Sequence, residues 1–99
     1  MEISKEKNGT TLTVSLSGKL DTSSSTELEA VIREDLEGIF TLIIDMKEIS
    51  YVSSAGLRVL MAAHKRMHKV GTMKLTHVCE DVKEILDMTG LLDFLAVED

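Results

Sequence analysis

Several residue types are scarce in this chain of 99 residues. It has no proline and no tryptophan, a single cysteine, and only two phenylalanines and one tyrosine. A single cysteine excludes an intramolecular disulfide and a zinc site built on several thiolates. Because disulfides are the mark of oxidising compartments, we expect a cytoplasmic protein. The shortage of aromatic rings also argues against a surface on which nucleic-acid bases stack.

Positive charge and long apolar runs are limited too. Seventeen acidic residues against eleven basic ones give a net charge of −6, which repels nucleic acid and anionic membranes. The apolar runs are much shorter than the roughly 18 residues needed to cross a bilayer. We therefore expect no nucleic-acid partner and no membrane partner. The apolar fraction of 43% suffices for the core of one domain, expected over residues 1–99.

The hydrophobic pattern predicts strands and helices in the order β-β-α-β-α-β-α. Asn8-Gly9 is typical of a hairpin turn, and strict alternation over 11–17 predicts a strand with one face in solvent. Apolar residues at helical spacing over 28–36 predict an amphipathic helix. Segment 40–45 is apolar at nearly every position, which predicts a central strand covered on both faces, followed by a loop to Ser53.

The second half of the chain repeats this alternation. A helix is predicted from Ser54 to the glycine at 71, a strand over 73–78, and a third helix from Glu80. Crossovers of this kind pair the later strands in parallel. The predicted fold class is α/β: one domain with a mixed, mostly parallel sheet of four or five strands and helices packed mainly on one face.

Finer expectations concern single residues. Ser24 and Glu27 have the spacing of a capping box. Cys79 is expected to be buried. Leu91, Leu92 and Phe94 form a last apolar patch before a short tail.

The most informative segment is 45–60, in which two serines, Ser53 and Ser54, arrive at the start of a helix. Backbone N–H groups and partial positive charge at this position stabilise a phosphate on a serine. Ala55 and Gly56 keep the hydroxyl accessible, and a helical glycine, which costs about 1 kcal/mol relative to alanine, indicates close approach of another group. Serine is also a good N-cap, so the residues alone leave a structural role open.

Three motifs resemble the STAS domain, the fold shared by anti-sigma factor antagonists and the cytoplasmic tails of sulfate transporters. They are Gly18-Lys19-Leu20-Asp21, the segment 45–60, and Asp87-Met88-Thr89-Gly90-Leu91, and together they span almost the whole chain. Their order and spacing make the resemblance specific.

The resemblance implies a switch. The unphosphorylated antagonist binds an anti-sigma factor that is also a serine kinase, and thereby frees a sigma factor. The kinase phosphorylates the antagonist, the complex loosens, and a serine phosphatase resets it. The family's phosphorylated serine falls on Ser54. Ser53 stands where the family often has aspartate and is the runner-up acceptor, while Ala55 replaces a frequent second hydroxyl.

The partner-binding surface implied in this way is Asp21, Thr22, Ser23, Ser53, Ser54, Ala55, Gly56, Leu57 and Arg58. No catalytic residue, metal or cofactor is expected, and the free chain is expected to be a monomer. A different role within the family, as a scaffold or a transporter-regulating subunit, is the alternative.

A serine hydrolase would need a histidine beside Ser54. At about 1.5 Å per residue, His64 and His68 lie roughly 15 and 21 Å along the helix, whereas spacing does not exclude His77. The nucleophile pattern Gly-x-Ser-x-Gly is also missing. The (i, i+4) spacing of His64 and His68 could hold a metal, but no third ligand is evident and packing is the favoured role.

Overall fold

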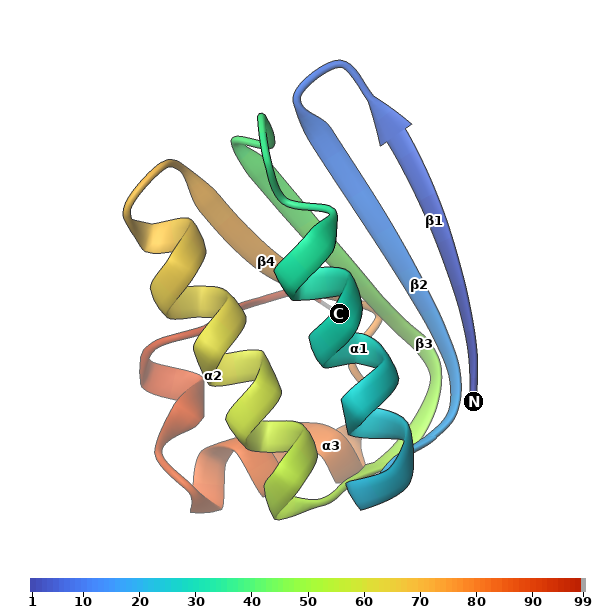
Figure 1. The fold of residues 1–99 in the computed structure, drawn as a ribbon. Coiled ribbons are helices and arrows are strands. Elements are labelled where there is room, and N and C mark those ends of the chain that lie inside the picture. Colours follow the sequence, from blue (N-terminus) through green and yellow to red (C-terminus); the bar gives the residue numbers. More distant parts are fainter. Residues whose placement is uncertain (99) are drawn as a thin grey trace.

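The computed structural model describes residues 1–98 and has a five-stranded sheet with three α-helices (Figure 1). This confirms the α/β class, the mixed sheet and the placement of the helices on one face. The chain order is β1 (Glu2–Asn8), β2 (Thr11–Leu20), α1 (Thr22–Glu34), β3 (Thr41–Val52), α2 (Ser54–His68), β4 (Thr72–Thr76), α3 (Glu80–Met88), the 3₁₀ helix η1 (Leu91–Asp93) and β5 (Ala96–Val97).

The strands follow their sequence order across the sheet, β1-β2-β3-β4-β5. β1 is antiparallel to β2, and the other neighbours are parallel. The predicted hairpin is confirmed: Asn8 pairs with Thr11, and Gly9 between them has the left-handed φ of 64°. The tail after the last apolar patch was not predicted to be a strand, but Ala96 and Val97 pair with β4.

α1 and α2 lie side by side over one face of the sheet (Figure 1). Leu12, Val14 and Leu16 of β2 point into the core beneath them, as the alternation predicts. The prediction that the central strand is covered on both faces is wrong. In β3, Leu42 and Ile44 are fully buried while Ile43 stays partly exposed, because the helices lie on the other face.

β3 continues to Val52 instead of ending at Asp45 in a loop, so that prediction is also wrong. Ser15 and Ser17 of β2 pair with Asp45 and Glu48 of β3, which leaves one extra residue in β3, and a second shift follows before β2 ends. Bulges of this kind change which residues face the core. Beyond Asp45 every third residue is therefore buried: Met46, Ile49 and Val52.

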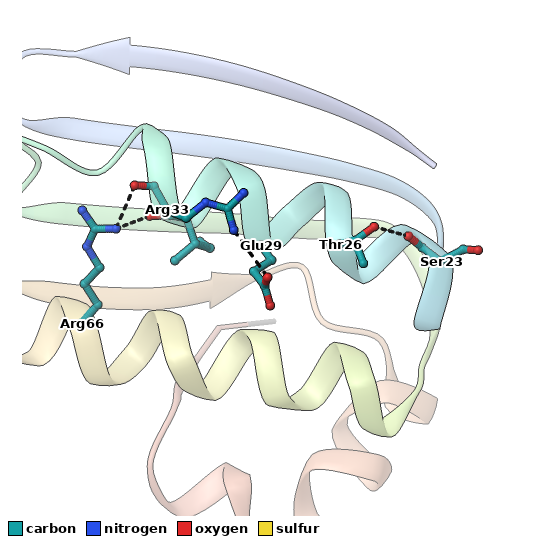
Figure 2. A network of polar contacts seen from close by, with 6 residues as sticks. Ser23, Thr26, Glu29, Arg33 and Arg66 are labelled. Carbon is teal, nitrogen blue, oxygen red and sulfur yellow. Dashed lines mark hydrogen bonds and ion pairs between the residues drawn. The ribbon is translucent and has the colours of Figure 1, made fainter.

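Arg66 of α2 hydrogen-bonds to the last turn of α1 (Figure 2). Nη1 of Arg66 donates to the carbonyl oxygens of Ile32 and Arg33, the latter at 3.2 Å. Carbonyls in the last turn of a helix have no partner within the helix. Figure 2 also shows the ion pair between Arg33 and Glu29, 3.5 Å apart. The Arg66 contacts hold the two helices in a fixed relation and so help position their starts.

Candidate functional site

α1 and α2 begin beside each other, where the parallel strands β2 and β3 end. The backbone N–H of Ser53, just before α2, donates to the carbonyl of Leu20 at the end of β2, at 2.8 Å. Asp21, the N-cap of α1, follows Leu20 directly. The fold thus brings the two predicted segments, 21–23 and 53–58, to one end of the molecule. Sites in parallel sheets are commonly found at this edge.

Asp21 holds the start of α1 through a reciprocal capping box with Ser24. The Ser24 N–H donates to Asp21 Oδ1 at 3.0 Å, and the Asp21 N–H donates to Ser24 Oγ at 2.9 Å. The predicted box between Ser24 and Glu27 is wrong, because the helix begins earlier and Ser24 is its third residue. The Ser24 backbone N–H, followed by its hydroxyl, lowers the pKa of Asp21. Asp21 is therefore ionised at neutral pH and places negative charge beside the start of α2.

The two serines before α2 differ in what their hydroxyls do. Ser53 is the N-cap: it is half-buried, and its Oγ accepts a hydrogen bond from the Gly56 N–H at 3.2 Å. Ser54 is the first residue of the helix and is exposed. Within the described residues its hydroxyl makes no hydrogen bond. Of the two side chains, that of Ser54 is therefore the more exposed and the one not engaged in capping α2.

Gly56 is buried, and its role is packing. A Cβ atom there would lie 2.8 Å from Leu20 Cγ, 2.9 Å from Leu20 O and 3.0 Å from Val52 Cγ1. The groups that come close to Gly56 are therefore the ends of β2 and β3, through Leu20 and Val52. Among the residues expected to bind a partner, the buried ones are Gly56 and Leu57, the half-buried ones are Asp21, Ser53 and Ala55, and the exposed ones are Thr22, Ser23, Ser54 and Arg58.

A shallow groove of about 320 Å³ runs beside Ser54, between α2 and the segment that joins α3 to η1. Sequence reasoning missed three of its residues. Met61 is half-buried on α2, and Thr89 and Leu91 belong to the third motif, whose place beside α2 no local pattern shows. The full lining is Ser54, Leu57, Arg58, Met61, Thr89 and Leu91.

The histidines lie apart from Ser54. His77 Nδ1 is 3.0 Å from Asp45 Oδ1, and the rings of His64 and His68 are 5.8 Å apart on α2. Over residues 1–98 no histidine hydrogen-bonds to Ser54, and no group of three His, Cys, Asp or Glu side chains could hold a metal. Cys79 is the exposed N-cap of α3, so the expectation that it is buried is wrong.

Known proteins identify the family. A model of the STAS domain matches residues 2–99. The chain belongs to the STAS domain family. One relative, the anti-sigma F factor antagonist of Paenibacillus polymyxa, is 30% identical over 105 residues, which cover 100% of this chain and 87% of that protein.

Solved STAS structures share the fold. The anti-sigma factor antagonist SpoIIAA in its unphosphorylated form matches with a TM-score of 0.83 at 18% identity, over 97% of this chain and 87% of the solved one. Phosphorylated SpoIIAA, a Bacillus cell fate determinant, matches with a TM-score of 0.77 at 18% identity, over 97% of this chain and 90% of the solved one. A sulfate transporter family protein from Wolinella succinogenes matches with a TM-score of 0.79 at 18% identity, over 88% of this chain and 75% of the solved one. In the STAS chain described here, none of the helices within residues 1–98 is long and apolar enough to cross a membrane.

Proposed function

We propose that this STAS protein is an anti-sigma factor antagonist: a cytoplasmic binding protein, not an enzyme, that is switched by phosphorylation of Ser54. The unphosphorylated chain binds an anti-sigma factor that is also a serine kinase, and a sigma factor is thereby released. The kinase transfers the γ-phosphoryl group of ATP to Ser54 Oγ, the hydroxyl proton is lost and ADP leaves. The antagonist then dissociates, and a serine phosphatase restores it.

One observation carries this proposal: an exposed, unbonded hydroxyl stands at the first position of α2, while its neighbour Ser53 is occupied in capping that helix. Phosphorylating Ser54 breaks no hydrogen bond among residues 1–98, so the folded domain can carry either state. Phosphorylating Ser53 would instead convert the oxygen that accepts from the Gly56 N–H into a phosphate ester and change the cap of α2. The choice of Ser54 over Ser53 follows from this difference.

Charge supplies the reason for release. A phosphate adds about −1.5 to −2 charges, and here it would join the ionised Asp21 at the same end of the molecule. A partner surface that fits the neutral serine would then have to desolvate an anion. The relatives named as antagonists, and the existence of SpoIIAA in both phosphorylation states, support this role over a transporter-regulating or scaffold role.

The test uses intact mass spectrometry and peptide mapping after incubation with ATP and each candidate anti-sigma factor kinase. Wild type and Ser53→Ala should gain one phosphate, and Ser54→Ala none. Ser54→Ala should also stay bound to the kinase in the presence of ATP, whereas Ser54→Asp should bind weakly. Ser4→Ala, which removes an exposed hydroxyl from β1, outside the expected partner-binding surface, is the control and should behave as wild type.

Two results would overturn the proposal. A phosphate that still appears in Ser54→Ala and maps to Ser53 would refute the acceptor. Absence of phosphate with every kinase of the source organism would refute the switch and favour the scaffold or transporter role.

A further inference from the structure

Arg58 is an exposed cation placed one helical turn after Ser54. Residues four apart on a helix are neighbours on its surface, and both side chains line the groove beside α2. Within residues 1–98 the Arg58 guanidinium makes no ion pair or hydrogen bond. Arg66 of the same helix differs, because its guanidinium donates hydrogen bonds to carbonyl oxygens at the end of α1.

No carboxylate competes for Arg58 along its own helix. The residues three and four positions away from it are Ser54, Ala55, Met61 and Ala62, all of them uncharged. Across the groove, the lining residues Thr89 and Leu91 are uncharged as well. Among these helix neighbours and the residues that line the groove, a phosphate on Ser54 would therefore be the first anion.

We propose that Arg58 is the intramolecular partner of phosphoserine at position 54. After phosphorylation the guanidinium turns back along α2 and pairs with the phosphate at the mouth of the groove. An arginine suits this role because its planar donors bind phosphate oxygens in pairs. The inference rests on the proposed function, because phosphoserine at position 54 is the species that it concerns.

The pairing gives the switch a second component. In the unphosphorylated chain Arg58 is available to an acidic side chain of the partner, next to the apolar side chains of Leu57, Met61 and Leu91. Phosphorylation adds negative charge and at the same time withdraws this positive charge from the partner. One chemical event thus removes two favourable features of the docking surface.

The experiment needs no kinase. Phosphoserine is incorporated at position 54 during translation of the full chain, and its second ionisation is followed by ³¹P NMR. The Arg58→Gln variant is compared with wild type. Lys65→Gln is the matched control, because it removes one exposed positive charge from the same helix at a position roughly 16 Å along the helix from Ser54. Asp21 is present in every chain compared, so its effect on the phosphate is common to them.

We expect the second pKa of the phosphoserine to rise by at least about 0.3 pH unit in Arg58→Gln, the size of an (i, i+4) ion pair with a doubly charged group. Lys65→Gln should match wild type, and Arg58→Lys should fall between the two. Raising the salt concentration to about 1 M should shrink the difference, since the Debye length falls to about 3 Å. Equal pKa values in Arg58→Gln and Lys65→Gln would overturn the inference.

Failure here and failure of the proposed function have different signatures. If no kinase phosphorylates Ser54 but the Arg58-dependent difference in pKa is found, the pairing stands and the proposed function falls. If kinases do phosphorylate Ser54 and the difference is missing, the function stands and the pairing falls. Because Arg58 is exposed and unpaired, its variants are expected to fold, which a ¹H–¹⁵N spectrum checks.

Discussion

Substituting Gly56 by alanine tests how the start of α2 is positioned. In an unconstrained helix this change is favourable by about 1 kcal/mol, because alanine has the higher helix propensity. Here the added methyl would lie 2.8 Å from Leu20 Cγ and 2.9 Å from Leu20 O. The Leu20 side chain can adjust by rotation, but its carbonyl is held by the hydrogen bond from the Ser53 N–H.

The magnitude follows from weighing these two effects. Overpacking a well-filled interior costs about 1–3 kcal/mol, and contact with a fixed backbone atom falls in the upper part of that range. After the propensity gain of about 1 kcal/mol is subtracted, we expect Gly56→Ala to lower the free energy of unfolding by about 1–2 kcal/mol. In a domain of this size that corresponds to a fall in Tm of roughly 5–10 °C.

Urea unfolding followed by circular dichroism measures the effect, and an unchanged m-value shows that the same two states are compared. Ala62→Gly is the control, since this exposed site on the same helix should lose about 1 kcal/mol through propensity alone. If Gly56→Ala were as stable as wild type or more so, helix propensity would dominate. The packing of α2 against Leu20 would then not be the reason for the glycine.

Three further changes probe the same end of the molecule and its support. Ser53→Ala removes the N-cap of α2 and should cost about 1 kcal/mol in urea unfolding; no loss would mean that the cap contributes nothing. Folding lowers the pKa of Asp21. The stabilisation that its charge provides is therefore fully present above the ordinary pKa of 3.8, and it is lost as the pH falls through the lower pKa of the folded state. The stability difference between wild type and Asp21→Asn should therefore be constant near neutral pH and shrink below about pH 4, and a flat difference down to about pH 2 would contradict this. Arg66→Gln should cost about 1 kcal/mol by leaving the Ile32 and Arg33 carbonyls without their charged donor, and unchanged thermal unfolding would contradict that role.

The parts of the fold that sequence predicted well depend on local periodicity. Leu28, Val31 and Ile32 recur at helical spacing and are buried on α1, and the alternation around Val14 gives the buried face of β2. Ile43 shows the limit of such patterns. An apolar run suits a strand covered on both faces, but coverage depends on where the helices pack, and here they share one face.

The predictions from sequence fail where contacts between two distant segments determine the structure. The bulges that extend β3 to Val52 exist only in its pairing with β2, and β5, at two residues, is too short to show a period. Which of the two serines caps α2 could not be predicted from local sequence, because Ser53 and Ser54 are both suited to an N-cap. The groove appears only when Thr89 and Leu91 come to lie beside α2.

The contacts of Leu20 tie the position of Ser54 to the end of β2 as well as to the end of β3, the strand that leads to it. The backbone of Ser53 bonds to the end of β2, and Gly56 rests on the same residue. An insertion or deletion in the bulged half of β3 can therefore be absorbed as a larger or smaller bulge while Ser54 keeps its place. Relatives of this chain should tolerate differences in length between positions 45 and 52, and a change in the size of the side chain at position 20 should displace Ser54 directly.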